Sequence, residues 1–125
     1  MFNKLQHKSN RVDLTKAVKE FLADLEKVIT TKDSARLHKK IEMLEMFGTG
    51  LGEPHASPVK GKLRELKVRV GKKWIRIFYF EAEHGEFVLV HAIAKKTNKL
   101  PPKEIELALI KMKEYETPVQ TNFEK

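Results

Sequence analysis

The chain of 125 residues contains no cysteine, so it can form no disulfide, thiol nucleophile or cysteine-based metal site. Its N-terminus, Met1-Phe2-Asn3-Lys4, lacks the apolar run of a signal peptide, and no segment approaches the length of a membrane span. The histidines show no metal-ligand spacing, and the glycines of 48–52 are not followed by the Gly-Lys-Ser/Thr of a phosphate-binding loop. These absences favour a cytoplasmic protein without membrane contact, and they point to no metal or cofactor.

Acidic residues are almost missing from one stretch of the chain. Between Lys60 and Arg76 eight residues are basic and only Glu65 is acidic, which accounts for +7 of the formal net charge of +8. The basic residues are Lys60, Lys62, Arg64, Lys67, Arg69, Lys72, Lys73 and Arg76. A concentrated positive patch on ordered structure is typical of proteins that bind phosphate backbones. The charge distribution therefore predicts a nucleic-acid partner.

Two helices are predicted in the N-terminal half, after a polar segment (1–12) that suits an edge strand or a loose arm. Apolar residues from Leu14 to Ile29 recur with helical spacing, with Asp13 as the expected N-cap. After a break at 30–33, a second helix is expected to reach Phe47 and to stop at Gly48. The Leu37, Ile41, Leu44 and Phe47 side chains are its predicted buried residues.

Strands and a last helix are predicted in the C-terminal half. A loop rich in glycine and proline (48–58) precedes three strands at 63–70, 74–80 and 87–93, joined by tight turns, and a helix at 103–115. We therefore expect a single α+β domain over 1–125, with a frayed tail at 117–125. Its helical hairpin and C-terminal helix should share one face of a small antiparallel sheet of three or four strands, leaving the other face free.

Lys67, Arg69 and Arg76 are the first candidate site residues. On the strand 63–70, Lys67 and Arg69 alternate with apolar residues and lie roughly 7 Å apart on the face opposite the helices. This spacing suits adjacent phosphates, although lysine is also common on solvated edge strands. Arg76 interrupts an apolar strand, so it needs either a ligand on an open face or a carboxylate partner, for which Glu65 is the alternative.

Lys95, Lys96 and Lys99 follow the third strand and are expected to join the same site, although a run of lysines can also be merely solvated. His91 lies within that strand and is expected to be packed in the core rather than to act as a base. Trp74 can stack on a nucleic-acid base. The acidic residues show no convincing catalytic pair.

The order of these segments resembles the RelE/HigB superfamily of toxins, and most closely its phage-derived HigB-like branch. The resemblance covers about residues 17–115. Its most specific part is Lys95-Lys96-Thr97-Asn98-Lys99-Leu100-Pro101, and Arg76-Ile77-Phe78-Tyr79 supports it. A RelE-like fold is what the resemblance implies.

The resemblance also implies a function. Such toxins are ribosome-dependent mRNA interferases, which cleave mRNA by attack of the 2′-hydroxyl on the adjacent phosphate, without metal. The expected partners are a helix-turn-helix antitoxin and mRNA on the ribosome, with operator DNA contacted only through the antitoxin. Matched by motif, Lys67 and Arg69 would hold the scissile phosphate, while Arg76 and Lys96 would stabilise transition-state charge.

The remaining basic residues of the patch, together with Lys95 and Lys99, are predicted to contact RNA. They are Lys60, Lys62, Arg64, Lys72 and Lys73.

The chain departs from the family pattern at three places. Lysine stands at position 67 where the branch has arginine, isoleucine stands at 93 in place of phenylalanine, and 100–102 lacks the tyrosine that RelE uses. No general base carries over, and Tyr79 and Tyr115 are weak substitutes. A non-catalytic protein that binds nucleic acid or an antitoxin, and an inactive remnant of the same fold, are the alternatives.

Overall fold

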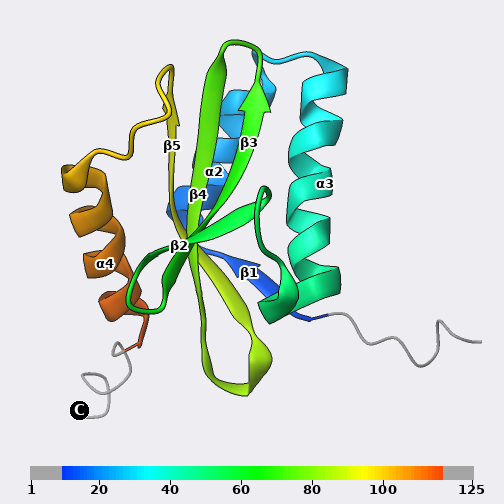
Figure 1. Ribbon diagram of the computed structural model, residues 1–125. Coiled ribbons are helices and arrows are strands. Elements are labelled where there is room, and N and C mark those ends of the chain that lie inside the picture. The colour runs from blue at the N-terminus through cyan, green and yellow to red at the C-terminus, as the bar shows by residue number, and fades with distance from the viewer. Residues whose placement is uncertain (1–9, 117–125) are drawn as a thin grey trace, which may run out of the picture.

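The computed structural model describes residues 10–116, which form a five-stranded sheet flanked by three α-helices (Figure 1). The strands are β1 (Val12–Leu14), β2 (Ala56–Lys60), β3 (Leu63–Val70), β4 (Lys73–Glu81) and β5 (Phe87–Lys95). The helices are α2 (Lys16–Glu26), α3 (Thr31–Phe47) and α4 (Pro102–Glu116), with short 3₁₀ turns η1 (Gly48–Gly50) and η2 (Glu83–Gly85). The predicted α+β class is confirmed, whereas the tail at 117–125 lies outside the described residues.

The sheet is mixed rather than purely antiparallel. Its order is β1-β5-β4-β3-β2, and β1 pairs with β5 in parallel while the other pairs are antiparallel. The prediction of three or four antiparallel strands was therefore wrong in count and in direction. It missed β2 because Pro58 looks like a loop residue, but proline is compatible with an edge strand, where its missing N–H faces solvent.

The helices do not share one face of the sheet, which corrects the second part of the prediction. One core lies between the sheet and the α2–α3 hairpin and contains Leu44, Leu66 and Ile77. A second core lies on the opposite face, where Ala108 and Met112 of α4 pack on β4 and β5. Figure 1 shows α2 behind the sheet and α4 on the other side. Among residues 10–116, the helices leave uncovered the part of the second face that lies beyond α4.

Helix boundaries differ from the predicted ones at the start of α2 and at the start of α3. Thr15, not Asp13, caps α2, because Asp13 belongs to β1 and pairs with β5. The second helix begins at Thr31, where the Thr30 side chain accepts a hydrogen bond from the Asp33 backbone N–H at 3.0 Å. The predicted stop at Gly48 is confirmed, whereas Phe47 is exposed rather than buried.

Candidate nucleic-acid interface

Adjacent strands β3 and β4 present basic residues on the half of the sheet that α4 leaves open. Lys67 is the cross-strand partner of Arg76, and Arg69 is the partner of Trp74. Because directly paired residues project from the same face of a sheet, these four side chains share one surface. The predicted clustering of Lys67, Arg69 and Arg76 is therefore present in the structure.

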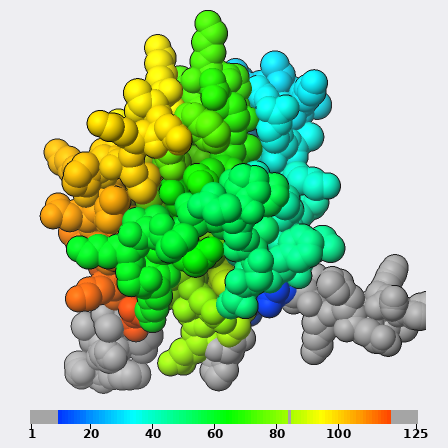
Figure 2. Space-filling model, in the orientation of Figure 1, coloured from blue at the N-terminus to red at the C-terminus, as the bar shows by residue number. Residues whose placement is uncertain are grey.

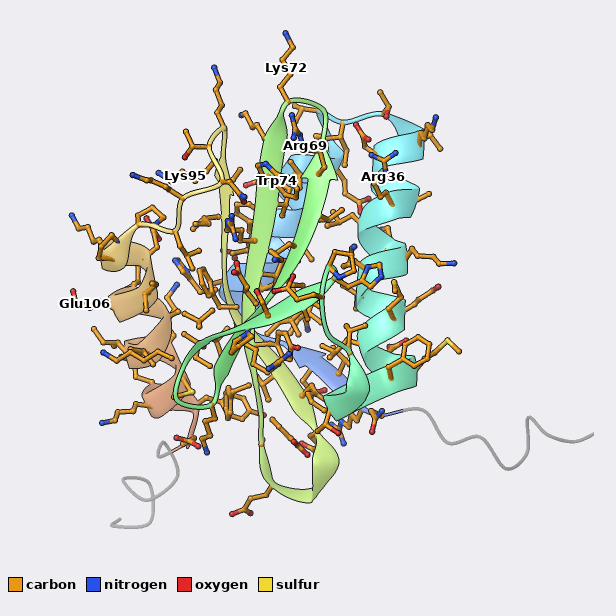
Figure 3. All side chains as sticks on the ribbon, viewed as in Figure 1. Arg36, Arg69, Lys72, Trp74, Lys95 and Glu106 are labelled. Atoms are coloured by element: carbon orange, nitrogen blue, oxygen red, sulfur yellow. The ribbon has the colours of Figure 1, made fainter. Side chains whose placement is uncertain are left out.

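Arg69 and Trp74 form the most exposed part of this surface. The Arg69 guanidinium lies 5.2 Å from the centre of the Trp74 ring, and its Nε donates to the Gly71 carbonyl at 3.2 Å. Lys95 of β5 pairs with Trp74 on its other side. Figure 3 shows Arg69 and Trp74 between Arg36 on α3 and Lys95. A cation stacked beside an indole can contact both a phosphate and the face of a base.

Arg76 is buried and forms an ion pair with Glu65, which was the structural alternative for this residue. Its side chain is 3% exposed, and Nη1 donates to the Glu65 carboxylate at 2.7 Å. Its Nη2 donates to the backbone and side-chain oxygens of Asn98, which ties the segment after β5 to the sheet. Ser57 donates to the second carboxylate oxygen of Glu65 at 3.3 Å. Arg76 thus fixes the shape of the surface from below.

The Nε atom of Arg76 is buried and has no hydrogen-bond partner among residues 10–116. Leaving a buried charged group partly unsatisfied costs free energy, so this atom marks a local departure from the otherwise complete pairing of the network.

Lys67 and its neighbours form a second group of cations at the β3 edge. The Lys67 ammonium contacts the Glu53 carboxylate at 2.9 Å, and its backbone N–H donates to the His55 carbonyl at 3.0 Å. The Lys40 ammonium of α3 lies 3.0 Å from Nδ1 of His55. Burial lowers the pKa of Lys40, and the positive charges of Arg36 and Lys67 lower it further. Burial and the Lys40 charge likewise lower the pKa of His55.

Sequence reasoning missed the residues that α3 and the loop before β2 add to this surface, namely Arg36, Lys40, Glu53 and His55. The available signal was the four-residue spacing of Arg36 and Lys40, which places both on one face of α3. Nothing in the sequence showed that this face lies beside β3.

The lysines around the β3–β4 turn and the end of β5 lie at one end of the sheet but on different faces. Lys72 and Lys73 occupy the turn, and Figure 2 shows this turn next to the segment after β5. Lys96 follows Lys95 and lines a cavity of about 390 Å³ on the hairpin side, together with Leu25 of α2 and with Val28 and Ile29 of the α2–α3 connection. The structure therefore does not bring Lys96 beside Arg76. Lys99 is exposed on the segment after β5.

Three other predicted RNA contacts lie away from the open surface. Arg64 projects toward the hairpin core, where it donates to the Tyr79 hydroxyl and the Leu51 carbonyl, each at 3.2 Å. Lys62 pairs with Glu116 at 2.6 Å at the opposite end of the sheet, and Lys60 is exposed near it at the end of β2. Neither Tyr79 nor Tyr115 lies on the open surface, because Tyr79 is in the hairpin core and Tyr115 packs against Phe80.

His91 is packed between β5 and α4, as the sequence predicted. Its ring stacks on Phe78, its Nε2 lies 2.7 Å from a Glu104 oxygen, and its Nδ1 lies 3.2 Å from the Lys111 ammonium. Because an ammonium can only donate, Nδ1 is the acceptor and Nε2 carries the proton. The contacts of His91 hold α4 against the sheet.

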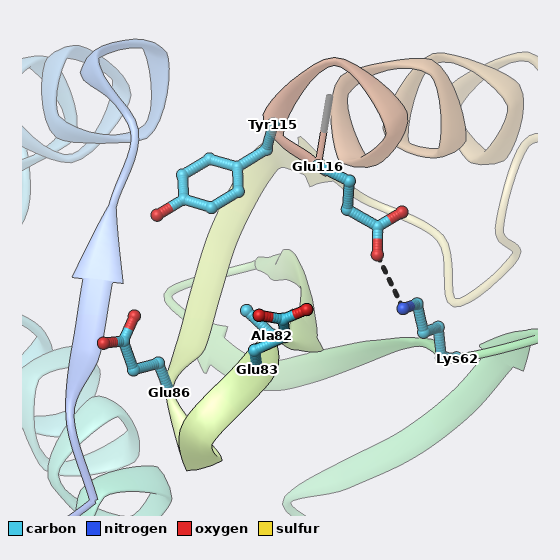
Figure 4. Close-up of a pocket in the computed structure, with 6 residues that line it drawn as sticks. All are labelled: Lys62, Ala82, Glu83, Glu86, Tyr115 and Glu116. Carbon is cyan, nitrogen blue, oxygen red and sulfur yellow. Dashed lines mark ion pairs between the residues drawn. The ribbon is translucent and has the colours of Figure 1, made fainter. Parts of the chain in front are cut away.

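A cavity rich in glutamate lies at the end of the sheet opposite the exposed lysines. It encloses about 410 Å³ between the β4–β5 connection and the end of α4, and Glu83, Glu86 and Glu116 are among its lining residues (Figure 4). Within residues 10–116, no group of three histidine, aspartate or glutamate side chains is placed to hold a metal ion. In the same range, no helix is long and apolar enough to cross a membrane.

The model of the family described as phage-derived protein Gp49-like matches residues 20–113. This chain belongs to that family. Gp49-like proteins are associated with RelE/HigB-like toxins of toxin–antitoxin systems, which agrees with the family resemblance of the sequence. The match begins within α2 and extends through the sheet into α4, so it includes every strand of the open surface. Comparison with curated proteins gave no significant match.

Proposed function

We propose that this Gp49-like protein is the toxin of a toxin–antitoxin pair and that it cleaves translated mRNA. The observation that carries the proposal is the open basic surface of β3 and β4, on which Lys67, Arg69 and Trp74 lie together. Cations fixed on a sheet can stabilise the extra negative charge that develops on phosphorus without reorganising during the reaction. Family membership supports the assignment to a toxin.

The residues of this surface are proposed to have different roles in binding and cleavage. Lys67 and Arg69 hold the scissile phosphate, and Trp74 stacks on an adjacent base. Arg76 positions the surface through Glu65 and Asn98, and it acts on the phosphate only when Asn98 moves away. The 2′-hydroxyl loses its proton to solvent as its oxygen bonds to phosphorus. The bond from phosphorus to the 5′ oxygen breaks, and that oxygen takes up a proton from solvent, which gives a cyclic phosphate and a free 5′-hydroxyl. Lys72, Lys73, Lys95 and Lys99 extend the contact with RNA.

The proposed partners are the ribosome-bound mRNA and a helix-turn-helix antitoxin. The toxin's net charge of +8 favours both a polyanion and an acidic protein surface. Operator DNA is reached only through the antitoxin in this proposal.

A non-catalytic binding protein of the same fold is the second candidate. The ion pair between Arg76 and Glu65 favours it, because a guanidinium that is 3% exposed makes no direct contact with a ligand in this conformation. The two candidates share the same surface and differ only in whether the bound RNA is cut.

Induced expression in a bacterial host separates these functions. We expect growth arrest, with mRNA cut inside codons and fragments that carry a cyclic phosphate. Co-expression of a helix-turn-helix protein encoded in the adjacent reading frame should restore growth. Unimpaired growth with intact mRNA would contradict the toxin proposal, and RNA binding by the purified protein without cleavage would favour the second candidate.

A further inference from the structure

Lys40 is a half-buried cation on α3. Its Nζ lies 3.0 Å from Nδ1 of His55, and no carboxylate within residues 10–116 forms an ion pair with it. The same surroundings that bury Lys40 also place Arg36 and Lys67 close enough to lower its pKa. A partly desolvated ammonium beside two other cations costs free energy, and that cost falls when an anion binds.

Arg36 and Lys67 frame Lys40 from two elements. Arg36 precedes it by one turn of α3 and donates through Nη1 to the Arg69 carbonyl at 3.3 Å, with Asp33 at 3.8 Å. Lys67 lies on β3, whose backbone is held to the loop before β2 by the hydrogen bond from Lys67 N–H to the His55 carbonyl. These contacts fix the backbones that carry all three cations.

The Glu53 carboxylate forms an ion pair with the Lys67 ammonium at 2.9 Å, although the Glu53 side chain is 64% exposed. An exposed ion pair of this kind contributes little to stability, typically about 0–1 kcal/mol. Glu53 can therefore leave at low cost. Its carboxylate stands where an incoming phosphate oxygen would meet Lys67.

We propose that Arg36, Lys40 and Lys67 form a binding subsite for one backbone phosphate of single-stranded RNA, with Glu53 as the group that the phosphate displaces. The inference rests on the proposed RNA-binding function and adds the path of the strand. From Arg69 and Trp74, the RNA backbone continues over the β3 edge onto α3, rather than toward α4. The phosphate supplies the anion that Lys40 lacks.

The test measures binding of a short 2′-O-methyl RNA, which cannot be cleaved, to the full chain at several salt concentrations. Lys40→Met should weaken binding about tenfold, equivalent to one charge-assisted hydrogen bond. It should also reduce the slope of log affinity against log salt by about 0.7, the value for one phosphate contact on a single strand. Lys39→Met is the matched control, because Lys39 is the next residue of α3 and is exposed. Equal effects of the two substitutions, or an unchanged slope in Lys40→Met, would overturn the subsite.

Two further variants keep the test decisive if Lys40→Met fails to fold, which thermal unfolding would reveal. Lys40→Arg should keep the affinity, and Glu53→Gln should tighten binding by removing the competing carboxylate. Weaker or unchanged binding by Glu53→Gln would count against the proposal.

Binding should also be accompanied by proton uptake in alkaline buffer, near the ordinary lysine pKa of about 10, because the phosphate raises the pKa of Lys40. The groups that face Lys40 are His55, Arg36 and Lys67, with Glu53 on Lys67. Of these, His55 is already neutral at that pH. Other lysines that contact RNA also take up protons, so the test is the difference: uptake by Lys40→Met as large as that of the wild type would overturn the assignment.

The proposed subsite and the proposed cleavage can be refuted independently of each other. Cleavage of mRNA by a protein whose Lys40→Met variant binds normally would refute the subsite alone. Binding that depends on Lys40 without any cleavage would refute the enzymatic proposal alone.

Discussion

The two ends of the sheet carry opposite charge although they are built from the same strands. At one end, the β3–β4 connection exposes Lys72 and Lys73, and Lys95 at the end of β5 is partly exposed. At the other end, the β4–β5 connection and the end of α4 gather Glu83, Glu86 and Glu116 around the acidic cavity. The lysine found there, Lys62, is paired with Glu116. The exposed lysines at the basic end are therefore better candidates for contact with a polyanion than Lys62 is.

The largest expected effect concerns the buried pair beneath the basic end. Replacing Arg76 with methionine leaves the Glu65 carboxylate buried without its partner, which should lower the free energy of unfolding by about 3–5 kcal/mol. Chemical denaturation monitored by circular dichroism measures this change. The double variant Arg76→Met, Glu65→Leu should recover most of the loss. If Arg76→Met is as stable as the wild type, the ion pair between Arg76 and Glu65 does not stabilise the fold beneath the basic surface.

An intermediate effect is expected for RNA binding at the two ends. Lys67→Met with Arg69→Met removes two cations from the open surface and should reduce the salt slope of binding to single-stranded RNA by about 1.4. Lys62→Met is the comparison at the acidic end, where three glutamates line the same cavity as Lys62 and disfavour a polyanion, and it should leave the slope nearly unchanged. Filter binding or fluorescence anisotropy over a salt series compares them. If Lys62→Met reduced the salt slope more than the double substitution did, RNA would bind at the acidic end rather than at the open surface.

The smallest effect is a pH dependence of stability at the β3 edge. Because the pKa of His55 is lowered below its ordinary value of 6.5, the unfolded chain takes up a proton more readily than the folded one. The contribution of His55 is therefore present above pH 6.5 and is lost as the pH falls through its folded-state pKa. Thermal unfolding of the wild type and of His55→Asn between neutral and acidic pH should diverge modestly. If the unfolding temperatures of the two proteins change with pH in the same way, His55 does not contribute to this pH dependence.

Much of the fold could be predicted from periodicity. The strand at 63–70 has its predicted bounds, and the helix stop at Gly48 was also identified, because alternation and a glycine with φ of 50° are local signals. Contacts between distant segments determine that β1 pairs with β5 and that α4 packs on the second face. No local pattern carries that information.

For the candidate site too, the residues on the strands could be predicted from local patterns, whereas their neighbours from other elements could not. Strand alternation placed Lys67 and Arg69 on one face, and cross-strand register then brought Arg76 beside them. The same alternation assigns Lys95 and Lys96 to opposite faces, but only the register between β4 and β5 shows that Lys95 is the one beside Trp74. The contribution of Lys40 depended on the docking of α3, which the sequence does not specify.

The parallel pairing of β1 with β5 joins residues 12–14 to residues 87–89. During synthesis the first strand therefore stays unpaired until residues 87–89 have been made, and β4 completes its ladder only after β5 has followed. Folding of the basic surface during translation must therefore follow the synthesis of β5.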